Sequence, residues 1–263
     1  MTNCPECNEP KRLRNTRGNI WRVACGCGDF ADFLPKERAT IIVPSKHPEI
    51  FADCRDTINK FAPSEKKILV RDGNDVECPA NWQMIQAPQG FVYSRNVNLG
   101  IVASTGDVLL CNDDVRFTQP NTLEILQNVM YQHPEVGIIS PLIRGDVGEF
   151  WQSHATHTLH YTQVRLCFVC LLIKREVIEK VGLLDETIGA NGGYGWDDTD
   201  MCRRVVNAGW KLGVTARATV IHGYGNDRRS ASFNRVPNAY TTGDAIAQKQ
   251  FFAKWGDLSL ECK

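Results

Sequence analysis

The sequence predicts an α/β fold, in which helices cover a mostly parallel sheet, preceded by a small cysteine-rich module. Two observations predict this arrangement. From residue 37 onward, short runs of aliphatic and β-branched residues alternate with segments of helical periodicity, as in sheets that are covered on both faces. Before that point, four cysteines fall within the first 27 residues as two close pairs. The expected division is a module over residues 1–36 and a large domain over residues 37–263, and the length is sufficient for both.

The N-terminal module is expected to be a zinc ribbon. Its cysteines form a C-x2-C pair and a C-x-C pair, namely Cys4 with Cys7 and Cys25 with Cys27. Four thiolates delivered by two tight turns match the tetrahedral geometry of a structural Zn²⁺ ion, and they leave no open position for catalysis. The residues between the pairs are sufficient for a hairpin of strands 11–14 and 20–24. The alternative is a cluster of free thiols.

Charge is distributed unevenly along the chain. The 30 Lys and Arg residues balance 30 Asp and Glu residues, which argues against a protein that coats polyanions with its whole surface. Residues 1–28 hold five basic and two acidic side chains, a charge of +3, so the remainder carries −3. The N-terminus is polar, and no apolar run reaches the ~18 residues of a membrane span. A cytoplasmic protein without a membrane span is therefore expected, in the host cytoplasm if the protein is viral.

Each element of the large domain follows from its local pattern. Strands are predicted where several aliphatic residues stand together, and helices where apolar residues recur at helical spacing before a proline, a glycine or a polar turn. The predicted strands are 39–43, 67–70, 107–111, 136–139 and 219–221. The predicted helices are 50–61, 93–104, 121–132 and 201–206, with a further helix that ends at Trp255.

Polar side chains directly follow three of the predicted strands. Asp72 follows the second strand, the triplet Asn112-Asp113-Asp114 the third, and His222 the last. Ligands of open α/β sheets bind beyond the carboxyl ends of the strands. Carboxylates with an imidazole suit a divalent metal that a phosphate substrate helps to bind. The alternative for the triplet is an ordinary acidic turn.

A second acidic cluster leads into the helix near residue 201. Glycines at 192, 193 and 195 precede Trp196, Asp197 and Asp198, and Asp200 follows Thr199. Acidic residues at a helix N-terminus interact favourably with the helix dipole, so capping is the alternative explanation. Three carboxylates exceed the needs of a cap, and one of them is a candidate general base.

In order and spacing, these motifs resemble glycosyltransferase family 2, whose members have the GT-A fold. The resemblance covers residues 39–255. Six segments carry it: 39–44, 70–74, 93–107, 112–114, 181–186 and 196–200. The last segment is especially similar to the Trp-Asp-Asp motif of galactofuranosyltransferases. The resemblance implies a Rossmann-like, mostly parallel sheet flanked by helices, and the inverting transfer of a sugar from a nucleotide-diphosphate sugar, usually a UDP-sugar, to an acceptor hydroxyl.

The resemblance also implies a role for each motif residue. Asp114 and His222 would bind Mn²⁺ or Mg²⁺, and Asp198 would be the general base. Contacts to the donor or the acceptor would come from Asp72, Arg95, Asn112, Asp113, Trp196 and Asp197. Arg228 and Arg229 would clamp the diphosphate through bidentate hydrogen bonds, or they are surface charges of a loop.

Several acceptors and one non-catalytic role are compatible with the sequence. Zinc ribbons often engage nucleic acid, so a hydroxymethylated base in DNA is the expected acceptor, as in viral DNA modification. Such a base would have to be flipped out of a duplex. The alternative is a saccharide, lipid-linked or protein acceptor, with a purely structural zinc module. A further alternative is a non-catalytic binding protein with a degenerate transferase fold. His154, His157 and His160 fall in the expected acceptor region as loop residues, and Cys167 and Cys170 are expected to be core thiols.

Overall fold

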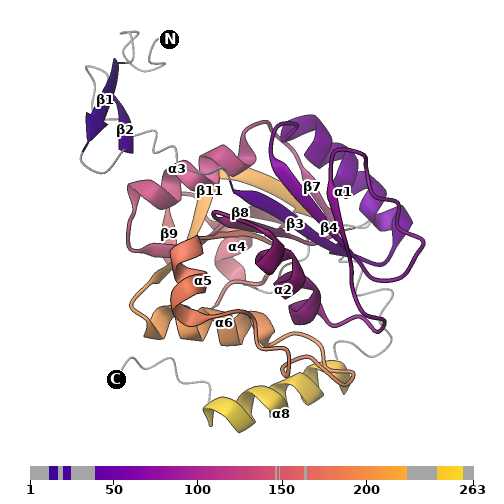
Figure 1. Cartoon of the computed structure of the whole chain (residues 1–263). Coiled ribbons are helices and arrows are strands. Elements are labelled where there is room, and N and C mark those ends of the chain that lie inside the picture. Colours follow the sequence, from indigo (N-terminus) through magenta and orange to yellow (C-terminus); the bar gives the residue numbers. More distant parts are fainter. Residues whose placement is uncertain are drawn as a thin grey trace.

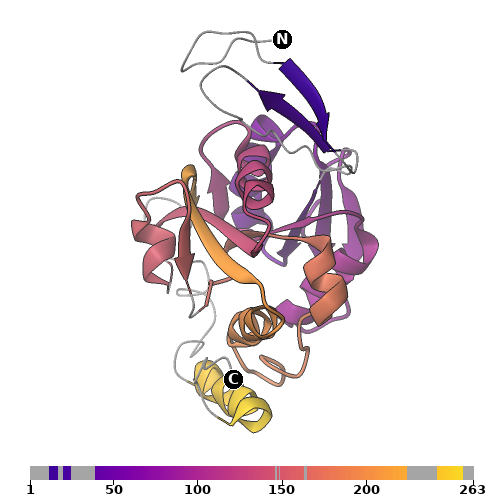
Figure 2. The same ribbon diagram turned by 90° about the vertical axis from the view of Figure 1, so that its left-hand side faces the viewer.

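The computed structural model describes residues 12–16, 20–24, 39–145, 147, 149–162, 165–223 and 242–256 (Figures 1 and 2). Strand β1 (Arg12–Thr16) pairs antiparallel with β2 (Ile20–Ala24). This pairing confirms the predicted hairpin. The four predicted zinc ligands lie outside the described residues, so the zinc ion stays a prediction.

The large domain is built on one nine-stranded sheet. Its path runs β5-β4-β3-β6-β10-β8-β11-β7, and β9 also pairs with β11. The strands in this path are β5 (Gln83–Gln86), β4 (Lys66–Arg71), β3 (Thr40–Ser45), β6 (Val108–Cys111), β10 (Cys170–Ile173), β8 (Val136–Gly145), β11 (Lys211–His222) and β7 (Val115–Phe117), with β9 at His160–Thr162. Strands β3 to β6 run parallel to one another, as do β8 and β11, which confirms a mostly parallel sheet.

Helices cover both faces of this sheet (Figure 1). On one face, α1 (Pro48–Phe61) and α3 (Thr122–Gln132) bury apolar side chains in one core cluster. On the other, α2 (Tyr93–Ala103), α5 (Arg175–Val181) and α6 (Asp197–Asn207) contribute to a second cluster. The short α4 (Phe150–His154) and the C-terminal α8 (Asp244–Trp255) complete the described helices. Strands that are buried from both sides explain the continuous aliphatic runs in the sequence.

Antiparallel β10 is the main element that the sequence pattern did not reveal. The apolar run over 166–173 predicted buried residues but did not indicate the direction of a strand. In the structure, β10 lies between β6 and β8 and is antiparallel to both. Cys170 is a buried free thiol, as expected, and Cys167 is half-buried. The polar edge strand β5 was also missed, because only Ile85 and Met84 in it are aliphatic or long apolar residues.

The histidine segment is more ordered than the predicted loop. His154 is the last residue of α4, and His160 is the first residue of β9. Helix α3 begins at Thr122, since Asn121 adopts a left-handed conformation with φ 61°. In the part of the chain that is described, no helix is long and apolar enough to cross a bilayer.

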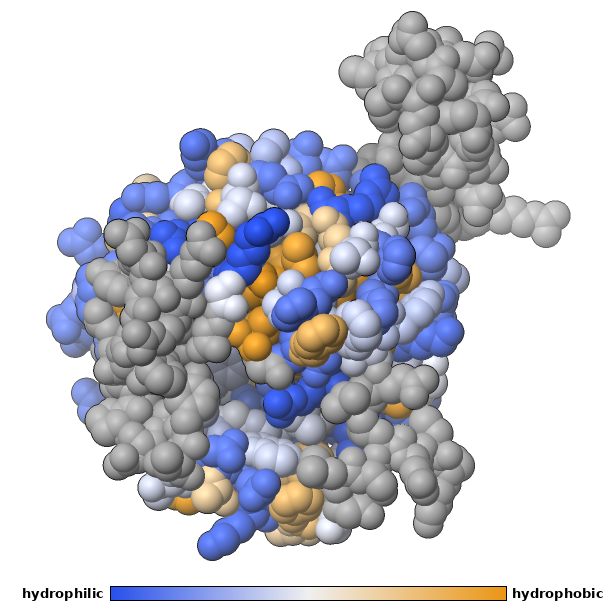
Figure 3. Space-filling model, turned by 180° about the vertical axis from the view of Figure 1, so that it is seen from behind, coloured by the Kyte–Doolittle hydropathy of each residue, from blue (hydrophilic) through white to orange (hydrophobic). Residues whose placement is uncertain are grey.

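Most large apolar side chains are buried, and the surface opposite to that of Figure 1 is mainly hydrophilic (Figure 3). Apolar residues are gathered in one central area of that view. Among the described large hydrophobic side chains that remain exposed are three aromatic residues, Phe150 (58%), Trp151 (37%) and Tyr161 (40%). These three residues belong to α4 and β9.

Candidate active site

The parallel strands bring the predicted polar residues to one edge of the sheet. Strands β3, β4 and β6 end at Ser45, Arg71 and Cys111, and β11 runs in the same direction and ends at His222. Strand β10 is antiparallel to both β6 and β8, so β6 and β11 share one direction. The carboxyl ends of these strands therefore carry Asp72, the triplet 112–114 and His222 at one edge, as the sequence predicted.

Asp114 and His222 are in direct contact. The antiparallel pairing of β7 with β11 sets Val115 opposite His222, and the amide of Gly223 donates to the carbonyl of Asp114 at 3.0 Å. The His222 Nε2 atom lies 3.1 Å from Asp114 Oδ1, and both side chains are buried. The structure thus joins the two predicted metal ligands, which are 108 residues apart in sequence.

Asp113 and Asn112 lie beside this pair. The Ser45 hydroxyl donates to Asp113 Oδ2 at 2.6 Å. Burial, and then the neighbouring charge of Asp114, raise the pKa of Asp113 to about 7. The backbone amide of Asn112 donates to the carbonyl of Val169 at 2.9 Å. The side-chain Oδ1 atom of Asn112 is buried and has no hydrogen-bond partner among the described residues. Ser45 was not predicted, although its position directly after the first strand is the signal that marks it.

These donors fit a hard divalent cation. Carboxylate, amide oxygen and imidazole suit Mn²⁺ or Mg²⁺ better than a soft metal, and Asn112 Oδ1 is an oxygen without a protein donor. Within the described ranges, no group of three or more His, Cys, Asp or Glu side chains is arranged to hold a metal by itself. Asp114 and His222 would therefore supply two ligands, and substrate phosphates or water would supply the others.

Asp72 and Arg95 are both held in place by nearby protein groups. The Asn96 side chain donates to Asp72 Oδ2 at 3.4 Å, and the Asp72 amide donates to the carbonyl of Ser45 at 2.9 Å. Asp72 thus sits next to the triplet 112–114, since Ser45 also binds Asp113. Arg95 donates to the backbone carbonyls of Pro88, at 3.0 Å, and of Gly90. These two hydrogen bonds fix the loop that precedes α2.

Asp197 and Asp198 form the first turn of α6. The amide and the hydroxyl of Thr199 donate to Asp198 Oδ1 at 2.6 and 3.1 Å. Burial raises the pKa of Asp198, and the positive charge of Arg165 opposes this shift. Burial, followed by the charge of Asp198, raises the pKa of Asp197 to about 7. The two neighbouring carboxylates titrate as a pair. Arg165 was not singled out in the sequence, since a lone Arg in an apolar context carries no motif.

The segment Phe168-Val169 connects this acidic pair with the metal pair. The Val169 carbonyl accepts from the Asn112 backbone amide at 2.9 Å, and the Phe168 backbone lies close enough to the carboxylate of Asp198 to lower its pKa. The Tyr93 hydroxyl donates to the Phe168 carbonyl at 2.9 Å. Burial and the charges of Asp197 and Asp198 raise the pKa of Tyr93 well above its usual range. The strand-end triplet and the candidate base therefore contact adjacent residues of one short segment.

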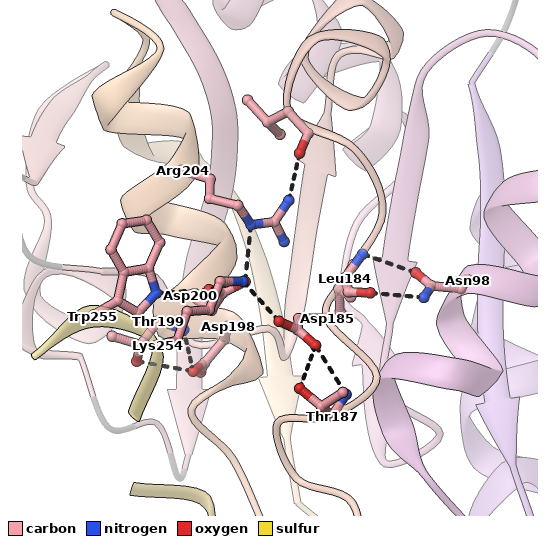
Figure 4. A network of polar contacts seen from close by, with 11 residues as sticks. Asn98, Leu184, Asp185, Thr187, Asp198, Thr199, Asp200, Arg204, Lys254 and Trp255 are labelled. Carbon is pink, nitrogen blue, oxygen red and sulfur yellow. Dashed lines mark hydrogen bonds and ion pairs between the residues drawn. The ribbon is translucent and has the colours of Figure 1, made fainter. Parts of the chain in front are cut away.

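Trp196 and Asp200 face the C-terminal helix. The indole N–H of Trp196 donates to Asp244 Oδ1 at 2.9 Å. The fully buried carboxylate of Asp200 contacts Arg204, Lys254 and Trp255 (Figure 4). Asp200 is thus a structural residue, whereas Asp197 and Asp198 remain for chemistry. Arg228 and Arg229 lie outside the described residues.

Three solved structures share this fold. A mannosyltransferase from Pyrobaculum calidifontis in complex with GDP-Man and Mn²⁺ matches with a TM-score of 0.61 and 17% identity, over 83% of this chain and 64% of that one. GalNAc-T7 with UDP, GalNAc and Mn²⁺ matches with a TM-score of 0.60 and 12% identity, over 81% and 47%. Residues 1–349 of TarS from S. aureus match with a TM-score of 0.55 and 11% identity, over 70% and 59%.

The chain therefore has the GT-A fold of glycosyltransferases, which confirms the expected fold class. It covers less than two thirds of each of these three structures. No protein-family model matches the sequence, and no curated protein is significantly similar to it.

Proposed function

We propose that the protein is an inverting, metal-dependent glycosyltransferase that uses a nucleotide-diphosphate sugar as donor. One observation carries this proposal: the Phe168-Val169 segment joins the triplet Asn112-Asp113-Asp114 to the acidic pair Asp197-Asp198. A site for a cation and phosphates thereby adjoins a buried carboxylate with a raised pKa. Both are needed when a hydroxyl displaces a nucleoside diphosphate.

The residues of the site have two separate roles in the proposed reaction, binding of the cation and the diphosphate, and removal of the acceptor's proton. Asp114 and His222 would hold Mn²⁺ or Mg²⁺, which supplies positive charge for the diphosphate leaving group. Thr199 donates two hydrogen bonds to Oδ1 of Asp198 and orients its carboxylate, which would accept the acceptor's proton. The acceptor oxygen then forms a bond to the anomeric carbon from the side opposite to the diphosphate, the bond to the diphosphate oxygen breaks, and the configuration inverts. Asp72, bound to Asn96, would contact the nucleoside.

We further infer that the acceptor is a hydroxymethylated base in DNA. The N-terminal hairpin lies in a segment with a charge of +3, which favours a polyanion. Two exposed aromatic residues of α4 pack against histidines: Phe150 stacks on His154 with ring centroids 4.2 Å apart, and Trp151 contacts His160 at 3.7 Å with the ring planes tilted by 34°. Such rings provide stacking surfaces for bases.

This aromatic surface is joined to the site through Gln152. The buried Gln152 side chain accepts from the Cys167 amide at 2.7 Å and donates to the Cys167 carbonyl at 3.0 Å. Cys167 directly precedes Phe168, whose backbone lies close to the carboxylate of Asp198. The aromatic rings are therefore anchored one residue from the segment that contacts the candidate base. Aromatic rings also pack against sugars, so a saccharide, lipid-linked or protein acceptor is the rival.

The proposal is tested by mass spectrometry of acceptors incubated with a panel of UDP- and GDP-sugars and Mn²⁺. Hydroxymethylated DNA should gain the mass of one sugar residue per modified base. The gain should vanish with EDTA and with Asp114→Asn, while the exposed-acid control Glu124→Gln on α3 should behave as wild type. Transfer to a glycan, a lipid-linked sugar or a protein, with no gain on DNA, would overturn the DNA acceptor. If no donor is consumed with any acceptor, the chain is a binding protein with a transferase fold.

A further inference from the structure

The C-terminal helix α8 packs against the loop that leads into the acidic pair. Its side chain Gln250 accepts from the Gly189 amide at 2.9 Å and donates to the Ala190 carbonyl at 3.2 Å. The carbonyl of Gly243, which precedes α8, accepts from the Tyr194 amide at 3.0 Å. Because this loop lies at residues 189–196, α8 holds it along most of its length.

Trp196, the last residue before α6, has an unfavourable backbone conformation. Its φ of 67° is in the left-handed region, which a bulky side chain rarely adopts. The indole N–H is bonded to Asp244 Oδ1 at 2.9 Å, and the ring packs against Phe251 and Phe252, with centroids 5.2 and 5.8 Å away. All three partners belong to α8. A strained residue persists only where its surroundings hold it, and such residues cluster at functional sites.

A second set of contacts fixes the first turn of α6 (Figure 4). The Lys254 ammonium bridges Asp200 Oδ1, at 2.8 Å, and Asp185 Oδ2, at 2.7 Å. The Trp255 indole N–H also donates to Asp200 Oδ1 at 2.8 Å. Asp200 is completely buried and lies two residues after Asp198 in the same helix. Displacement of α8 would therefore leave a buried carboxylate with fewer partners, which is costly.

We propose that α8 is a positioning element for the general base, acting through Trp196-Asp244 and Lys254-Asp200. This inference rests on the proposed transferase function. In this proposal, Trp196 contacts α8 and acts as a positioning residue. The sequence resemblance had implied that it contacts the donor or the acceptor. Helix α8, which begins 130 residues after Asp114 in the sequence, thereby positions Asp198 toward the acceptor. Donor binding is independent of α8, since Asp72, Asp114 and His222 lie at the ends of strands.

Steady-state kinetics of five full-length variants test this proposal. Asp244→Ala and Trp196→Phe each remove one partner of the indole hydrogen bond, and Asp244→Asn retains an acceptor oxygen. Misplacement of a reacting group by about 1 Å can cost about a hundredfold in rate. We therefore expect kcat for transfer to fall by about 100-fold in Asp244→Ala and Trp196→Phe, with the Kd of the Mn²⁺-nucleotide complex unchanged. Asp244→Asn should restore most of kcat.

Lys254→Met is compared with Lys249→Met, which removes an exposed lysine from the same helix. Only Lys254→Met should lower kcat. Wild-type kcat in Asp244→Ala and Trp196→Phe would overturn the proposal, as would a loss of nucleotide affinity that matches the loss of kcat. If Asp244→Ala fails to fold, Trp196→Phe decides, because it keeps an aromatic ring at position 196. An inactive wild type with every acceptor would instead refute the proposed function.

Discussion

The Asp114–His222 contact makes a specific prediction at the scale of single residues. The Nε2–Oδ1 distance of 3.1 Å, with both groups buried, brings together the two residues that we propose as ligands of the cation. Calorimetric titration with UDP or GDP should show that Mn²⁺ strengthens binding in the wild type. His222→Ala should lose more than about tenfold in affinity with Mn²⁺ and little without it, since even indirect partners of metal ligands contribute 10- to 100-fold. An equal loss with and without Mn²⁺ would assign His222 to the nucleotide itself.

Asp197 makes a prediction about stability and pH. Burial and the charge of Asp198 raise its pKa to about 7 in the folded state, above its ordinary value of 3.8. A carboxyl group with a raised pKa favours folding in its protonated form, so its contribution is complete below pH 3.8 and is lost as the pH rises through about 7. Asp197→Asn mimics the protonated form. Its melting temperature should exceed that of the wild type by a few degrees at pH 8, and the difference should shrink at pH 5.

One result would contradict a raised pKa of Asp197. A constant difference in melting temperature between pH 5 and pH 8 would mean that Asp197 does not titrate with a raised pKa.

Asp185 provides the opposite case within the same region. Its burial is outweighed by hydrogen bonds from Lys254 and Thr187, which lower its pKa to about 2. Asp185→Asn should therefore destabilise the protein at pH 8, and the loss should diminish only in strong acid.

At the scale of elements, α2 packs closely against β3 at Gly100. A Cβ atom added at Gly100 of α2 would lie 3.1 Å from Cδ1 and 3.2 Å from Cγ1 of Ile42, and closer still to Cγ2. Alanine is favoured over glycine within a helix by about 1 kcal/mol, whereas overpacking costs about 1–3 kcal/mol. Gly100→Ala should therefore lower the free energy of unfolding by up to about 2 kcal/mol in urea titration.

Val102 provides the control on the same helix. Its side chain is 72% exposed, so Val102→Ala should change the free energy of unfolding by less than about 0.5 kcal/mol. A stabilising effect of Gly100→Ala would show that α2 can move away from β3 without loss. In that event α2 would be held less rigidly than its packing indicates.

For the whole molecule, the sequence predicted the parallel part of the sheet well. Runs such as 39–43 and 107–111 are buried on both sides, so their aliphatic character is continuous and unambiguous. The direction of β10 could not be predicted, because an apolar run such as 170–173 has the same pattern in either direction. Strand β5 was not predicted because it is a polar edge strand.

The site was predictable where it follows a strand. Asp72, Asp113, Asp114 and His222 are marked by their places after aliphatic runs, and the sheet then brings them together. Partners that depend on tertiary contacts carry no such mark. Trp196 was predicted to contact the donor or the acceptor, and only the position of α8 reveals its bond to Asp244. Arg165 is a further residue of this kind.

The central claim, that Asp198 is the base of a metal-dependent sugar transfer, is tested most directly with Asp198→Asn. The measurement is the single-turnover rate of transfer from a nucleotide sugar in the presence of Mn²⁺, together with nucleotide affinity and melting temperature. Loss of a general base typically costs 10²- to 10⁴-fold. We expect a loss of at least about 100-fold with affinity and melting temperature near those of the wild type. Transfer by Asp198→Asn at the wild-type rate would contradict it.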